Sequence, residues 1–176
     1  ILGIHTENNR QIVFVDTPGL HKHTPHAINR YMNKSVVQAI DGVNAIIWVI
    51  DWREWTQEDE RVLSLLEKQT VPIILVVNKV DLSKNKDDLL PLLQKLSQKL
   101  HFTATIPVSA LKNINVTSIY QALNPLMPES PYYYPEDECT DASVRFLIAE
   151  KVREKLTREL SQELPYDLTV MIEQYE

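Results

Sequence analysis

Three short polar motifs, each directly after an apolar run, contain the residues of this chain best suited to chemistry. The first motif follows residues 12–15 and consists of Asp16, Thr17, Pro18, Gly19 and Leu20. An aspartate at a strand end can hold Mg²⁺, usually through water, and a following glycine lets its backbone N–H approach a γ-phosphate. Alone, the motif also fits an ordinary turn, because proline and glycine occur in many loops.

The second motif follows the apolar run at residues 73–77 and consists of Asn78, Lys79, Val80 and Asp81. A carboxylate at Asp81 can accept hydrogen bonds from both N1–H and the exocyclic amine of guanine. Adenine offers neither donor in that place, and a site built for such donors can reject the wrong base by about 10⁴ to 10⁵. Asn78 would hold the other edge of the base and brace the loop, and Lys79 would lay its stem along the ring.

The third motif follows residues 104–108 and consists of Ser109, Ala110, Leu111 and Lys112. A small residue with a free backbone N–H at this place can donate to the guanine O6, where adenine presents an amine. A loop that simply starts a helix explains the motif equally well when it is taken alone. Three such motifs in this order, each after an apolar run, favour a guanine-nucleotide site.

The elements that must position these motifs belong to an α/β layer domain. Up to about Met127, short β-branched apolar runs alternate with amphipathic stretches, which predicts a mostly parallel sheet. Strands are expected at residues 1–6, 11–15, 45–51, 73–78 and 104–109, the first two joined as an antiparallel hairpin on the sheet edge. Helices are expected near residues 27–40, 57–69, 87–101 and 115–126. In the second helix, Thr56 and Asp59 stand at capping-box spacing, and Val62, Leu65 and Leu66 should face the sheet.

The last part of the chain has a different organisation. Three prolines within residues 128–139 predict an extended linker, with residues 132–134 docking it against its neighbours. Asp141 is expected to cap a helix that ends before Pro165, and residues 168–173 should form a strand. This tail of about 36 residues is shorter than the roughly 40 at which a chain without disulfides usually folds alone. We expect it to begin a second domain.

Composition narrows the class of protein further. The chain is 44% hydrophobic and 24% charged, as in soluble globular proteins, and its one cysteine, Cys139, excludes internal disulfides and fits a reducing compartment. The longest apolar runs are far shorter than the roughly 20 residues of a membrane-spanning helix, and no signal peptide is visible, so a cytoplasmic location is expected. The net charge of −6 argues against nucleic-acid binding by these residues alone.

The three motifs resemble the third, fourth and fifth G-motifs of translation-factor-like small GTPases. The sequence around them is similar to that of the Era family, in the TrmE-Era-EngA-Septin-like class. Residues 20–21 and 27–34 resemble the second switch of that family. Blocks within residues 135–166 resemble its interdomain linker and the start of its KH domain. The resemblance implies a P-loop NTPase G domain lacking its P-loop at residues 1–127, a linker at 128–140, and the beginning of a type II KH domain at 141–176.

The same resemblance assigns roles to the motifs. It implies that residues 16–20 face the γ-phosphate and Mg²⁺, with Asp16 the metal ligand, and that residues 78–81 and 109–111 bind the guanine of GTP or GDP. It further implies a monomeric, GTP-hydrolysing switch that binds 16S rRNA and acts in assembly of the small (30S) ribosomal subunit, and it allows peripheral association with the inner face of the cell membrane.

Departures and absences limit these expectations. Asn113 replaces the family's usual glycine but tolerates a left-handed backbone. Leu20 stands where Ras-like enzymes place a water-orienting glutamine, so no catalytic group is assigned and slow hydrolysis is expected. The chain contains no GxxxxGK[ST] loop, and no GxxG follows Pro165, so these residues alone should neither bind GTP tightly nor clamp RNA.

Two other readings remain open at this point. One is a tandem-G-domain or tRNA-modifying GTPase, which would lack the block at residues 135–166. The other is a degenerate, non-catalytic scaffold.

The histidines and tryptophans are expected to have structural roles. The histidines at 21, 23 and 26 should lie in a switch loop and not form a metal site, and Trp48, Trp52 and Trp55 should pack on the following helix.

Overall fold

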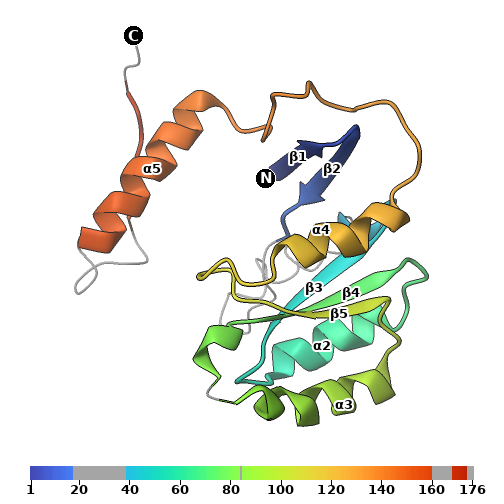
Figure 1. Cartoon of the computed structure of the whole chain (residues 1–176). Coiled ribbons are helices and arrows are strands. Elements are labelled where there is room, and N and C mark those ends of the chain that lie inside the picture. Colours follow the sequence, from blue (N-terminus) through green and yellow to red (C-terminus); the bar gives the residue numbers. More distant parts are fainter. Residues whose placement is uncertain (18–38, 84, 160–167, 174–176) are drawn as a thin grey trace. The chain divides into compact units, whose positions relative to one another are not determined.

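The computed structural model describes residues 1–17, 39–83, 85–159 and 168–173 (Figure 1). They form two compact units: Ile1–Asp16 with Tyr132–Glu176, and Thr17–Pro131. Most of the helix expected near residues 27–40 lies outside the described residues, as do the site candidates Pro18, Gly19 and Leu20 and the three histidines that follow.

The first unit begins with the expected antiparallel hairpin of β1 (Leu2–Glu7) and β2 (Arg10–Val15), but the hairpin is a two-stranded sheet of its own and not, as expected, the edge of the parallel sheet. The strands pair in register from Leu2 opposite Val15 to Glu7 opposite Arg10. The two turn residues, Asn8 and Asn9, have φ values of 50° and 60°. Asparagine is among the residues that best tolerate this left-handed backbone, which gives a two-residue turn the twist of its flanking strands.

The linker runs along β1 and is hydrogen-bonded to it. The Ile4 amide donates to the carbonyl oxygen of Cys139 at 2.8 Å, and the Thr140 hydroxyl donates to the carbonyl oxygen of Leu2 at 2.8 Å. Asp141 Oδ1 accepts from the Leu2 amide at 2.9 Å. The linker therefore satisfies backbone groups on the β1 edge that β2 leaves unpaired.

The helix after the linker, α5 (Val144–Glu159), starts later than expected. The hydroxyl oxygen of Ser143 accepts from the Phe146 amide at 3.2 Å, so Ser143 supplies the capping contact that we expected from Asp141. Residues 168–173 are described and form no strand. Several apolar side chains remain substantially exposed: Val144, Phe146, Leu147, Ile148, Val152 and Leu156.

Gln11 fastens the start of the linker to the hairpin. Its Nε2 donates to Thr6 Oγ1 at 3.0 Å and to the carbonyl oxygen of Tyr134 at 2.9 Å. Its Oε1 accepts from the amides of Tyr133 and Tyr134, both at 3.0 Å. One side chain thus provides both a donor and an acceptor to the linker backbone.

We expect Gln11→Ala to speed amide hydrogen exchange of Tyr133 and Tyr134 by about fivefold to tenfold, because each lost hydrogen bond contributes about 1 kcal/mol. Exchange measured by NMR tests this. Arg10→Ala, which truncates an exposed side chain on the same strand, is the matched control and should leave both rates unchanged. Equal exchange rates in the Gln11 variant and the wild type would show that the linker is held by other contacts.

The second unit is built on a parallel sheet in the order β3 (Ile46–Asp51), β4 (Ile73–Asn78), β5 (Ala104–Pro107). Helices α2 (Gln57–Leu66) and α3 (Leu90–Lys99) cover one face and α4 (Thr117–Leu123) lies on the other (Figure 1). The described part of this unit also contains the short 3₁₀ segments η1 (Val80–Leu82), η2 (Lys86–Leu89) and η3 (Asn124–Leu126). The predicted α/β layer domain with a parallel sheet is confirmed.

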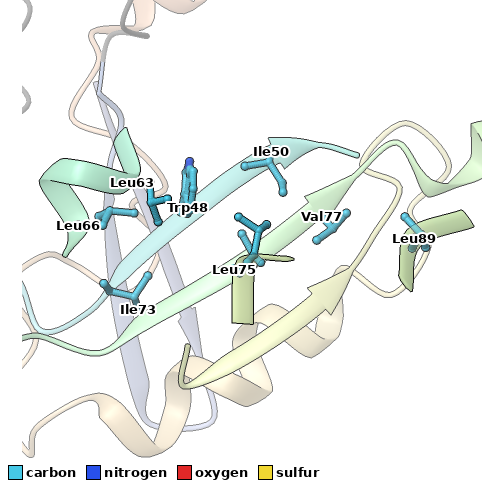
Figure 2. Close-up of a cluster of buried hydrophobic side chains, with 9 residues drawn as sticks. Trp48, Ile50, Leu63, Leu66, Ile73, Leu75, Val77 and Leu89 are labelled. Atoms are coloured by element: carbon cyan, nitrogen blue, oxygen red, sulfur yellow. The ribbon is translucent and has the colours of Figure 1, made fainter. Parts of the chain in front are cut away.

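The core lies between this sheet and α2 and α3. Five consecutive β4 residues, 73–77, are buried, as expected of a central parallel strand covered on both faces. Leu63 and Leu66 of α2 join Trp48 in this core (Figure 2). The Thr56–Asp59 capping box is formed as predicted, but the helix buries Leu63 and Leu66, whereas Val62 and Leu65 are only half-buried.

The predicted packing of the tryptophans on the following helix is confirmed: Trp48 shares its buried cluster with two leucines of α2, and Trp52 and Trp55 pack against that cluster. The ring centroids of Trp48 and Trp55 are 5.9 Å apart. Among the described helices, none is long and apolar enough to cross a membrane.

Candidate nucleotide-binding site

The second and third motifs meet at the carboxyl edge of the parallel sheet. β4 ends at Asn78, the first residue of its motif, and the third motif begins two residues after β5 ends at Pro107. The Val108 amide donates to the carbonyl oxygen of Val77 at 2.8 Å, and the Val80 amide donates to that of Val108 at 3.1 Å. These bonds extend the pairing of β4 and β5 into the loops, at the edge where open parallel sheets bind ligands.

Asn78 joins the two motifs through its side chain. Its Oδ1 accepts from the Lys79 amide at 2.8 Å and from the Ala110 amide at 3.1 Å. The sequence-based expectation that Asn78 braces the loop is therefore met by a specific contact, with the third motif as its other end.

The third motif is a tight loop around Ser109, which is fully buried. The Ser109 amide donates to the carbonyl oxygen of Ile114 at 3.1 Å, and Ser109 Oγ accepts from the Lys112 amide at 3.1 Å. Asn113 has φ of 53°, the left-handed backbone expected of it in place of glycine. The Leu111 amide makes no hydrogen bond within the described residues, which leaves it available to a ligand, whereas the amides of Ser109 and Ala110 are already bonded.

The carboxylate of Asp81 is also available. Its residue is half-buried in η1, and among the described residues it accepts no hydrogen bond and forms no ion pair. Its negative charge does act on Arg53, whose pKa is raised by the Asp51 carboxylate first and by Asp81 to a smaller extent. A half-buried carboxylate without hydrogen-bond donors of its own is suited to accept two N–H donors from a base.

Lys79 is held by residues that the sequence did not single out. Its backbone is left-handed, with φ of 66°, and its ammonium lies 2.9 Å from Asp51 Oδ2. The Trp52 indole N–H donates to the Lys79 carbonyl oxygen at 3.0 Å. The pKa of Asp51 is held well below its usual range by the Arg53 guanidinium, which is hydrogen-bonded to it, and to a smaller extent by Lys79. Partial burial of Asp51 acts in the opposite direction.

The first motif is described only at its start. Asp16 and Thr17 are exposed, and the Asp16 amide donates to the carbonyl oxygen of Ile1 at 3.1 Å, so Asp16 directly follows the end of β2 as predicted. The Asp16 carboxylate has no partner within the described residues. Over the same residues, no three His, Cys, Asp or Glu side chains gather as a ready-made metal site.

Comparison with known proteins identifies this arrangement. Residues 4–129 match the elongation factor Tu GTP binding domain family. The chain belongs to that family. The matched range contains all three motifs, the second and third of which are joined through Asn78.

Among curated relatives, the chain is similar in sequence to proteins named GTPase Era, as predicted. The chain is 47% identical over 175 residues to GTPase Era of Marinobacter nauticus and 46% identical to GTPase Era of Ectopseudomonas mendocina, covering 99% of this chain in both cases. It spans 57% and 58% of those relatives' own lengths.

Solved structures agree. Era in complex with MgGDPNP and nucleotides 1506–1542 of 16S ribosomal RNA is 32% identical, with a TM-score of 0.79 over 93% of this chain and 56% of its own. An Era point variant from Aquifex aeolicus bound to GDP·AlF4⁻ is 31% identical, with the same TM-score and coverage. The predicted resemblance to Era is confirmed.

Proposed function

We propose that this chain supplies the guanine-selecting and switch residues of a GTP-hydrolysing, Era-type protein. The observation that carries the proposal is the bridge from Asn78 to Ala110, which joins two loops that each leave a guanine-reading group unpaired. Those groups are the Asp81 carboxylate and the Leu111 amide.

Guanine selection follows from the polarity of these groups. Asp81 accepts from N1–H and the exocyclic amine of guanine, and the Leu111 N–H donates to O6. Adenine reverses the polarity at the positions of O6 and N1. The Asp81 carboxylate would then face the N1 acceptor, and the Leu111 N–H would face the N–H donors of the adenine amine. Unpaired polar groups in a partly buried site give strong discrimination.

The Asp16 carboxylate fits the proposed Mg²⁺ site, because it is exposed, unpaired among the described residues and directly after a strand. Mg²⁺ is commonly bound through one or two carboxylates together with phosphates and water, and when bound it neutralises charge on the phosphates. The rest of the first motif, Thr17, Pro18, Gly19 and Leu20, would face the γ-phosphate and form part of the switch. The side chain of Leu20 cannot orient water by hydrogen bonding, so the proposal assigns no catalytic group.

The proposed domain boundaries are a G domain at residues 1–127, a linker at 128–140 and the beginning of a KH domain at 141–176. The exposed apolar side chains of α5 support the last boundary, because they suit a helix that is covered when a KH fold is complete. The similarity to relatives extends over 175 residues and so includes residues 135–166, which favours Era over tandem-G-domain or tRNA-modifying GTPases.

By the same resemblance we propose that the full-length protein is a cytoplasmic monomer, able to associate peripherally with the inner face of the membrane. Its RNA would be 16S rRNA, and its process small-subunit assembly. The structure of Era with nucleotides 1506–1542 of that RNA supports this choice of partner.

The test uses the full-length protein. We expect Mg²⁺-dependent GTP hydrolysis, no measurable ATP hydrolysis, and binding to an RNA of nucleotides 1506–1542 of 16S rRNA that exceeds binding to a scrambled RNA of equal length. Hydrolysis followed by phosphate release and binding followed by fluorescence anisotropy provide the two readouts. Loss of both activities in a folded protein would favour the scaffold interpretation instead.

A further inference from the structure

The last residue of β3, Asp51, and the residue after it, Trp52, contact the second motif although they belong to none of the three motifs. β3 and β4 pair in parallel with Asp51 opposite Asn78, so the end of β3 lies beside the start of the guanine-reading loop. The Asp51 carboxylate pairs with Lys79 Nζ at 2.9 Å, and the Trp52 indole N–H donates to the Lys79 carbonyl oxygen at 3.0 Å. Lys79 is therefore held at both its side chain and its backbone.

The Asp51 carboxylate is itself fixed by Arg53. Arg53 Nη2 donates to Oδ2 at 2.6 Å, Arg53 Nε donates to Oδ1 at 3.0 Å, and the Arg53 amide donates to Oδ1 at 3.1 Å. A two-pronged arginine contact restrains the plane of a carboxylate as well as its position. The side chain of Asp51 is 24% exposed, against 46% for Arg53 and 50% for Lys79, so the acceptor is the least solvated member of the group.

This support matters because Lys79 has an unfavourable backbone. With φ of 66° and ψ of 29° it occupies the left-handed region, which costs a residue with a side chain free energy unless its surroundings hold it there. Lys79 lies between Asn78, which bonds the third motif, and η1, which contains Asp81. A change in the backbone of Lys79 would therefore move Asp81 relative to Asn78.

We infer that Asp51 is a positioning residue for guanine recognition: through Lys79, and together with Trp52, it holds the loop in the conformation from which Asn78 and Asp81 read the base. The inference rests on the proposed function. Asp51 contributes by preorganisation, since a loop already in its bound conformation loses less entropy when the ligand binds. Isolated exposed ion pairs contribute little, but here Arg53 and Trp52 supply additional fixed contacts.

The experiment is a double-mutant cycle on GDP affinity in the full-length protein. We expect Asp51→Asn to weaken GDP binding about threefold to tenfold, and to have no further effect in a Lys79→Met background, because its action passes through Lys79. Asp87→Asn, an exposed aspartate on η2, is the matched control and should bind GDP as the wild type does. Effects of Asp51→Asn and Lys79→Met that simply add would overturn the inference, as would unchanged affinity of Asp51→Asn.

A second variant covers the case in which Asp51→Asn does not fold. Trp52→Phe removes the indole N–H and keeps an aromatic side chain, and we expect a twofold to threefold loss of GDP affinity with unchanged far-UV circular dichroism. Wild-type affinity in this folded variant would overturn the inference that the end of β3 positions the loop. A wild-type protein that does not bind GDP would instead overturn the proposed function itself, so the two failures are distinguishable.

Discussion

Replacing Asp81 with asparagine should weaken GDP binding by about 100-fold and shift the preference toward xanthosine diphosphate. The amide keeps one oxygen acceptor but introduces a donor toward the exocyclic amine of guanine, and a lost charge-assisted hydrogen bond can contribute up to about 3 kcal/mol, or two factors of ten. Xanthine carries a carbonyl in place of that amine, so the new N–H donor of asparagine gains a partner.

Isothermal calorimetry of the full-length protein with GDP, XDP and ADP measures this change directly. Asp137→Asn, an exposed linker residue, makes the same chemical substitution away from the site and should preserve the wild-type profile. If Asp81→Asn bound GDP as tightly as the wild type, Asp81 would not be the residue that selects guanine.

Asn78→Ala should weaken GDP binding by about tenfold or more and lower the free energy of unfolding by about 1 kcal/mol. The substitution removes the acceptor shared by the Lys79 and Ala110 amides, at 2.8 and 3.1 Å. Water can replace part of this bonding because Ala110 is exposed, so the stability loss belongs at the lower end of the range for a lost hydrogen bond. The affinity loss is larger because the two loops are no longer joined.

Urea unfolding and GDP titration of Asn78→Ala give the two quantities in one variant. Asn44→Ala, at an exposed position before β3, serves as the control for removing an asparagine side chain. Wild-type GDP affinity together with wild-type stability would rule out the bridge from Asn78 as the organiser of the site.

The parts of the fold that the sequence predicted well are those set by local pattern. The range 73–78 for β4 matches the strand in the structure, because a continuous Ile/Leu/Val run bounded by proline and asparagine has few alternatives. The meeting of the second and third motifs also followed from sequence, since parallel strands end at one edge of a sheet.

Contacts between distant segments were not predictable in the same way. Asp141 and Ser143 are both good capping residues, and the sequence gives no reason to prefer Ser143. A contact with Leu2 decides between them: the Leu2 amide donates to the Asp141 carboxylate, 139 residues away in the sequence. Once Asp141 is engaged there, Ser143 supplies the helix-start contact at the Phe146 amide.

The roles of Asp51 and Trp52 were missed for a related reason. Trp52 was expected only to pack, and packs against the core as expected, but its indole N–H also reaches Lys79. Neither residue stands in a recognisable motif. A usable signal did exist: Asp51 ends the strand next to β4, so the predicted parallel register could have placed it beside Asn78.

The central claim is that Asp81 and the loop bearing Leu111 read guanine, and a structure of the full-length protein with GDP and Mg²⁺ tests it most directly. We predict that the two Asp81 carboxylate oxygens lie about 2.7–3.2 Å from N1 and the exocyclic amine of guanine, with the Leu111 amide at a similar distance from O6. A base bound elsewhere, or an Asp81 carboxylate turned away from it, would contradict the account.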